Sequence, residues 1–220
     1  MSIINIRSNN FRNFLLLCGI FTSLLYPITD ILAGNLYKGY SFNEQAVSEL
    51  FAIGAPTSRI VVPLLTLCSI FLLAFAIGVW LSSNKRSMHI LAVMLGGNAI
   101  NSLILWNFFP MHMRGDQKTF TDIMHTILAI NPFVLLSIIF GIFIYRNWFR
   151  FYSIITVLLQ VIPAIIAFSF VPLFIANKPT PWLGFTERIS QYGYQLWLLV
   201  LAILLIQKQS DKKLHSKQVL

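Results

Sequence analysis

Residues 106–125 read WNFFPMHMRGDQKTFTDIMH and separate two long apolar runs of the chain. The stretch is rich in ionisable side chains, although only 10% of the chain is charged. These side chains include His112, Arg114, Asp116, Asp122 and His125. Pro110 ends the first apolar run and Gly115 permits a tight turn, so the stretch joins two helices and brings polar chemistry to their ends.

The chain as a whole is too apolar for a soluble protein. Its 220 residues are 57% hydrophobic, with a mean hydropathy of +0.75. Soluble proteins are roughly half apolar and about one quarter charged. No polar segment is long enough to bury a core of its own. The sequence therefore predicts a single membrane domain whose main partner is the lipid bilayer.

Charge and cysteine content exclude some other classes. The formal net charge is +9, but the basic residues stand at the ends of apolar runs, where membrane topology places them, so we expect no nucleic-acid partner. Cys18 and Cys68 lie inside apolar runs without a CxxC motif and behave as small buried hydrophobes. Composition leaves the oligomeric state open.

The fold class predicted is all-α, a polytopic bundle of six transmembrane helices. A span requires about 20 apolar residues. Arg7 and Arg12 precede the first run like the start of a signal peptide, but no small-residue cleavage site follows, so we expect this helix to be retained. The domain covers residues 1–207, followed by a basic cytoplasmic tail at 208–220. The spans are expected at about 14–33, 61–81, 90–109, 123–145, 151–175 and 189–206.

Basic residues predict the orientation of this bundle. With six spans, ten Lys and Arg residues fall on the side of the two termini and six on the other. Cytoplasmic loops hold the excess, so both termini are expected in the cytoplasm, and the protein in the inner membrane if it is bacterial. Six of the seven acids fall on the outer side. The outer side therefore carries the mixed-charge chemistry.

The first outer connection, residues 34–58, is long enough to hold structure. Ser41 and Glu44 have the spacing of a capping box, while Gly54 and Pro56 end a helix. We therefore expect a short amphipathic helix over residues 42–53, with Glu49 on its polar face. A solvated loop is the alternative.

Polar residues recur at helical spacing in four spans. Lipid offers no partner for an amide or carboxylate, so these rows are expected to face the bundle interior and to form a polar cavity that opens outward. The alternative is helix-to-helix hydrogen bonding, worth about 0.6 to 2 kcal/mol per contact. The rows are Gly19, Ser23, Tyr26 and Asp30; Gly97, Asn98 and Asn101; Ser153, Thr156, Gln160 and Pro163; and Arg188, Gln191 and Gln195.

Two catalytic arrangements are compatible with the outer residues. Asp122 and His125 stand three residues apart on one helical face, so the carboxylate could orient the imidazole for acid and base catalysis. Ser48 could then serve as a nucleophile, although no GxSxG motif surrounds it. Alternatively, His125, Asp122 and His112 could bind a divalent metal, although no HExxH motif occurs.

Ligand binding is a third use of the outer residues. Arginines at the rim could hold a phosphate or carboxylate headgroup through paired hydrogen bonds. The alternative is that they form ion pairs with Glu49, Asp116 and Glu187. The candidates for ligand binding are Asp30, Glu49, Arg59, Arg114, Asp116, Glu187, Arg188 and Gln191.

Several segments together resemble a known family. They are Ser48-Glu49-Leu50 with Gly54-Ala55-Pro56-Thr57, Phe109-Pro110, Arg114-Gly115-Asp116 with Asp122 and His125, and Glu187-Arg188-Ile189 with Trp197. Their order is similar to that in the DUF998 family of six-span membrane proteins, and the likeness covers nearly the whole chain. The resemblance implies a fold and no particular activity.

Two functions follow as hypotheses. The first is binding, sensing or transport of a small polar molecule or lipid headgroup in the outer cavity. The second is an intramembrane lipid hydrolase, with or without a metal, in which case the protein is an enzyme. The polar helix rows and the rim arginines motivate the first, and Asp122, His125, Ser48 and the nearby acids motivate the second.

Overall fold

A computed structural model describes residues 2–144 and 148–218. Within these residues the fold is entirely helical apart from one isolated β-bridge between Ile53 and His112. The α-helices are α1 (Ser2–Leu36), α2 (Ser58–Leu81), α3 (Arg86–Phe108), α4 (Phe120–Ala129), α5 (Pro132–Ile144), α6 (Trp148–Ser169), α7 (Val171–Ile175) and α8 (Leu183–Gln218), and η1 (Val47–Phe51) is a 3-10 helix.

Six helical segments of the described chain are long and apolar enough to cross a membrane, as the sequence predicts. The spans are Asn10–Leu36, Ser58–Leu81, Arg86–Phe108, Phe120–Ile144, Trp148–Ser169 and Leu183–Asp211. The protein is therefore a multi-pass integral membrane protein.

The fourth and fifth predicted spans are interrupted where proline follows. The fourth divides into α4 and α5 at Asn131 and Pro132, because proline cannot donate the hydrogen bond that continues a helix. The fifth ends at Ser169, and Pro172 lies in the first turn of the separate helix α7. Tyr145, the predicted end of the fourth span, lies outside the described residues.

The last helix is longer than predicted at both ends. α8 begins at Leu183 and continues to Gln218, through most of the predicted tail. Residues 219–220 of that tail lie outside the described residues. The early start places Glu187 and Arg188 in the first turns of the helix, where Arg188 has partners on α1 and in the preceding loops.

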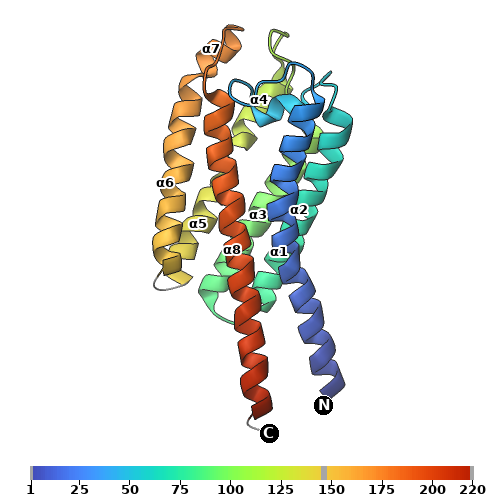
Figure 1. Cartoon of the computed structure of the whole chain (residues 1–220), viewed down its shortest axis with the longest axis vertical. Coiled ribbons are helices and arrows are strands. Elements are labelled where there is room, and N and C mark those ends of the chain that lie inside the picture. The colour runs from blue at the N-terminus through green and yellow to red at the C-terminus, as the bar shows by residue number, and fades with distance from the viewer. Residues whose placement is uncertain (1, 145–147, 219–220) are drawn as a thin grey trace.

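The six spans form a closed ring in which each packs against the next along the chain, and α8 returns to pack against α1. Both termini lie at one end of the ring (Figure 1). We call the opposite end, formed by residues 34–57, 109–119 and 176–182, the distal end. The largest apolar core lies in the half nearer the termini, around Phe75 and Trp197. The distal half contains less of this apolar core, and it is there that a site is sought.

The short helix at the distal end is present but differs from the prediction. It covers only Val47–Phe51, because the Glu49 carboxylate accepts the Ala46 backbone N–H at 2.9 Å and restarts the helix there. The Ser41 hydroxyl accepts the Glu44 N–H at 3.3 Å, so half of the expected capping interaction forms. Glu49 is not on a solvated face. It is 1% exposed, because an arginine from another loop reaches it.

Candidate functional site

A buried ion pair joins α1, α8 and the first distal loop. Arg188 donates from Nε and Nη2 to the two carboxylate oxygens of Asp30, at 2.8 Å each. Its Nη1 donates to the carbonyls of Phe42, Gln45 and Gly184 at 2.8 to 3.1 Å. Every guanidinium nitrogen is thus engaged inside the protein. Asp30 and Arg188 therefore bind each other and offer no free charge to a ligand.

Two tyrosines complete this pair. Tyr192 donates its hydroxyl hydrogen to Asp30. Arg188 also donates to the Tyr40 hydroxyl oxygen at 2.6 Å, and Tyr40 donates in turn to the Ala46 carbonyl at 2.8 Å. Burial raises the pKa of Tyr40 above its ordinary value, so this residue remains a phenol that can donate. The four side chains tie the loop to the two helices.

A second ion pair joins three distal loops. Arg114 donates from Nη2 to Glu49 at 2.8 Å and from Nη1 to the Thr180 hydroxyl at 2.9 Å. Thr180 donates to the Glu44 carbonyl at 2.9 Å. The guanidinium also lies 5.0 Å from the centre of the Phe174 ring. The distal loops are therefore held together by an arginine that the sequence left open as a ligand contact.

Of the predicted rim ion pairs, the one with Glu49 forms, with Arg114. Arg188 pairs with Asp30 and not with Glu187. Arg59 and Asp116 are exposed, and neither forms a side-chain ion pair within residues 10–144 and 148–211. The arginines at the distal end therefore do not converge on a common site for a lipid headgroup.

The structure gives Asp122 a different partner from the one predicted. Its carboxylate accepts the backbone N–H groups of His112 and Thr119 at 2.8 Å each and lies 2.8 Å from His112 Nδ1. His125 instead places Nδ1 2.8 Å from the Phe109 carbonyl. Asp122 is occupied at the start of α4, capping the helix and holding the preceding loop. It therefore does not orient the His125 imidazole.

The predicted metal ligands are likewise divided between these two contacts. Among the described residues, no group of three or more His, Cys, Asp or Glu side chains is placed to hold a metal ion. His112 and Asp122 bond to each other, and His125 bonds to a carbonyl, so the three do not converge on a common point.

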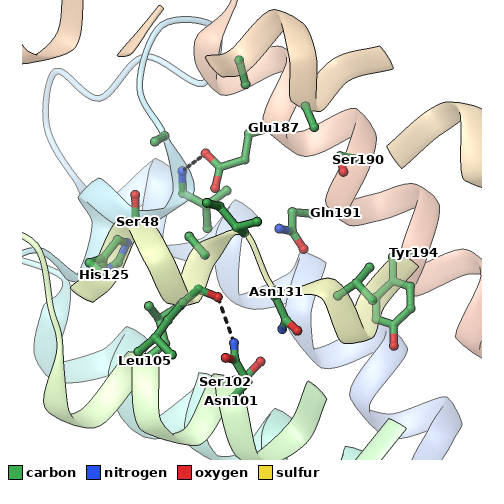
Figure 2. A pocket seen from close by; sticks show the side chains of 18 of the residues that line it. Ser48, Asn101, Ser102, Leu105, His125, Asn131, Glu187, Ser190, Gln191 and Tyr194 are labelled. Carbon is green, nitrogen blue, oxygen red and sulfur yellow. Dashed lines mark hydrogen bonds between the residues drawn. The ribbon is translucent and has the colours of Figure 1, made fainter. Parts of the chain in front are cut away.

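A cavity of about 570 Å³ lies in the distal half of the ring (Figure 2). η1 lines its distal end with Val47, Ser48 and Phe51, and α8 lines one wall with Glu187, Gln191 and Gln195. Of the predicted polar rows, it receives Tyr26, Asn98, Asn101, Gln160, Gln191 and Gln195. The predicted convergence of these rows is therefore seen at the cavity.

The break between α4 and α5 supplies the cavity with polar groups. Asn131, with a positive φ of 21°, donates to the Asn98 side-chain oxygen at 2.7 Å. Asn98 donates to the Tyr194 hydroxyl at 2.9 Å. Asn101 donates to the Leu128 carbonyl at 2.9 Å, which is one of the carbonyls that the helix break frees. Non-helical backbone at this depth is thus satisfied by amides from α3.

The cavity opens between α4 and α6. Most residues that line it are buried or half-buried, but those facing this gap are exposed. They are Thr126, Ala129 and Ile130 from the α4 side and Val161, Ile165 and Phe168 from α6. Both segments are membrane-spanning and mostly apolar, so the gap faces the region that lipid occupies. η1 lines the distal end of the cavity, and the exposed lining residues lie at the side of the ring between α4 and α6. That the cavity also opens outward stays a prediction.

Sequence reasoning missed several residues of this region. The sequence assigned no site role to Tyr40, Tyr192 or Thr180, which carried no signal beyond their polarity. Their roles depend on loops that meet only in the folded chain. Ser48 and His125 were identified and do line the cavity, although within the described residues no hydrogen bond joins them.

Comparison with known proteins gives one match. The profile of a family described as "Protein of unknown function (DUF998)" matches residues 20–204. A search of curated proteins and a search of solved structures each gave no match.

Proposed function

The chain belongs to the DUF998 family, and we propose that this member binds a small amphiphilic molecule in the cavity between α4, α6 and α8. The observation that carries the proposal is a cavity of about 570 Å³ with an apolar side gap and a polar inner wall. Small-molecule sites have volumes of about 300 to 1,000 Å³ and combine apolar walls with a few fixed polar groups.

The direction of the opening supports an amphiphile over a wholly polar solute. A ligand that enters between α4 and α6 passes exposed apolar side chains such as Ile165 and Phe168. The polar groups, including Gln191 and Asn131, lie within (Figure 2). An apolar body would lie along the gap and a polar end would reach these groups, which is the arrangement that lipid-facing entry favours.

An intramembrane hydrolase is the second candidate, and one observation favours it. Ser48 and His125 both line the cavity. An activated serine also needs a base within hydrogen-bond reach and a group that orients that base. Asp122 bonds to His112 instead. Binding needs no such alignment and is the function that we propose.

Filling the cavity tests the proposal. Ala164 lies on α6 and lines the cavity, and Ile162 lies two residues away, is 54% exposed and does not line it. We expect Ala164→Trp to reduce co-purifying amphiphiles by about tenfold or more, equivalent to at least 1.4 kcal/mol of binding. Ile162→Trp, the matched control, should retain them. The measurement is mass spectrometry of solvent extracts from protein purified in a mild detergent.

Retention of the same molecules by all three proteins would overturn the proposal, as would the absence of any species enriched over the detergent extract of the membranes. Melting temperatures of the three proteins, measured in parallel, separate a filled cavity from a misfolded variant.

A further inference from the structure

We propose that the ligand's polar end is a cationic amine and that Glu187 is its counter-ion. The inference rests on the proposed function and names the chemical class of the ligand. It predicts a single-chain amphiphile with an ammonium group, whose nitrogen binds beside α8 and whose apolar chain lies toward the gap between α4 and α6.

Glu187 carries a carboxylate at the cavity wall with one partner only. Its Oε2 accepts the Val47 backbone N–H at 2.9 Å. The other oxygen points toward the cavity (Figure 2). Within residues 10–144 and 148–211, no Lys, Arg or His side chain forms an ion pair with it.

The neighbouring arginines cannot supply the missing charge. Arg188 follows Glu187 in α8, but all its nitrogens are engaged with Asp30, Tyr40 and loop carbonyls. Arg114 is engaged with Glu49 and Thr180. Moving either guanidinium to Glu187 would leave another buried carboxylate without a partner, which is strongly unfavourable.

The residues that line the cavity include neither Lys nor Arg, and Glu187 is their only carboxylate. His125 also lines it, but its Nδ1 lies 2.8 Å from the Phe109 carbonyl, and no ion pair joins it to Glu187 among the described side chains. In a pocket flanked by lipid the effective dielectric constant is low, so an unpaired carboxylate attracts a cation more strongly than in water. A ligand phosphate or carboxylate would instead be repelled.

Two further lining atoms are acceptors without donors. Asn131 Oδ1 and Gln195 Oε1 are buried with no hydrogen-bond partner, and Gln195 is only 8% exposed. Buried polar atoms are satisfied in more than about nine cases in ten. Both atoms line the same cavity as Glu187, so they offer acceptors to a ligand that carries N–H or O–H groups. The ammonium itself is selected by the charge of Glu187, and these acceptors are compatible with it.

The test compares two probes of equal length, tetradecylamine and tetradecanol, on the protein in phosphatidylcholine nanodiscs. The wild type is compared with Glu187→Gln, which keeps an oxygen for the Val47 N–H but removes the charge. Glu44→Gln is the matched control, because Glu44 is exposed and does not line the cavity. Binding is measured by titration of the melting temperature.

We expect wild type and Glu44→Gln to bind the amine at least about tenfold more tightly than the alcohol, and Glu187→Gln to lose this preference, since truncating a buried charge pair costs at least that factor. Equal affinity of the wild type for both probes, or an unchanged preference in Glu187→Gln, overturns the inference but leaves the proposed function standing. Failure of both probes to shift any melting temperature overturns the inference. The proposed function is tested by the separate extraction experiment, and it is overturned if the Ala164→Trp extract contains the same molecules as the wild-type extract.

Discussion

At the scale of single residues, the buried charges of this protein divide into two kinds. Asp30 and Glu49 are 2% and 1% exposed and each is paired with an arginine. Glu187 accepts one backbone N–H and has no cationic partner among the described residues. A paired charge in a low-dielectric setting fixes the positions of the elements that supply it. An unpaired one at a cavity wall is available to a ligand, which is why we propose a binding role for Glu187 and a structural role for the other two.

Arg188 should therefore be essential for stability. Replacing it with leucine leaves Asp30 buried without a counter-ion and removes the guanidinium donor from three carbonyls. We therefore expect a loss of about 3 to 5 kcal/mol in unfolding free energy. Arg59→Leu, on the exposed surface, should stay within about 0.5 kcal/mol. Equilibrium unfolding in detergent measures both.

A double-mutant cycle distinguishes the ion pair from simple loss of packing. Asp30→Asn combined with Arg188→Leu should cost less than the sum of the two single changes, because each single variant leaves one buried charge unpaired and the double variant leaves none. Equal melting of Arg188→Leu and Arg59→Leu would contradict the structural role assigned to this arginine.

At the scale of elements, the fourth span is divided and the first distal loop lies directly on α8. The break at Asn131 could be anticipated from Pro132, since proline ends the hydrogen-bond ladder. The hydrogen bonds made at the break could not be anticipated, because they come from Asn98 and Asn101 on α3. Discontinuous helices at membrane depth line cavities in many membrane proteins, and this one does so as well.

Gly184 determines how closely the loop approaches α8. A Cβ atom placed there would lie 2.1 Å from the Gln45 carbonyl oxygen and 2.6 Å from that of Phe42. Gly184→Ala should therefore displace the loop from Arg188 and destabilise the protein by about 1 to 3 kcal/mol. The measurement is thermal unfolding of the purified variant.

Gly193 on the same helix provides the control. A Cβ atom there would meet Leu159 at an ordinary 3.6 Å, and alanine favours a helix by about 0.5 to 1 kcal/mol over glycine. Gly193→Ala should then be neutral or slightly stabilising. A neutral or stabilising Gly184→Ala would contradict the close approach of the Phe42 and Gln45 carbonyls to α8.

At the scale of the whole molecule, the ring places both termini at one end and the cavity toward the other (Figure 1). The excess of Lys and Arg on the side of the termini predicts that this end is cytoplasmic. The cavity would then lie in the outer half of the bilayer, where an amphiphile of the outer leaflet could reach it through the gap between α4 and α6.

Cysteine labelling tests this orientation. Asp116→Cys lies at the distal end and Asn84→Cys in the connection between α2 and α3, and both positions are exposed. The native Cys18 and Cys68 are 2% and 5% exposed, so they should react little. We expect an impermeant maleimide to label position 116 in intact cells and position 84 only after permeabilisation. The reverse pattern would invert the topology.

The sequence alone determined the membrane class, the six spans and the positions of polar rows. These follow from hydropathy and helical period, which are local properties. It also identified nearly every charged residue that matters, including Asp30, Glu49, Glu187 and Arg188, because charges near a bilayer are few.

Only the tertiary structure decided which of these residues are paired. Asp30 and Arg188 are 158 positions apart, and Glu49 and Arg114 are 65 apart. No periodicity links such distant residues, because each partner is chosen by how loops fold over the closed ring. The same packing that satisfies Asp30 and Glu49 leaves Glu187 with a single N–H. Which carboxylate lacks a cationic partner among the described residues is therefore a property of the assembled bundle and not of the sequence around it.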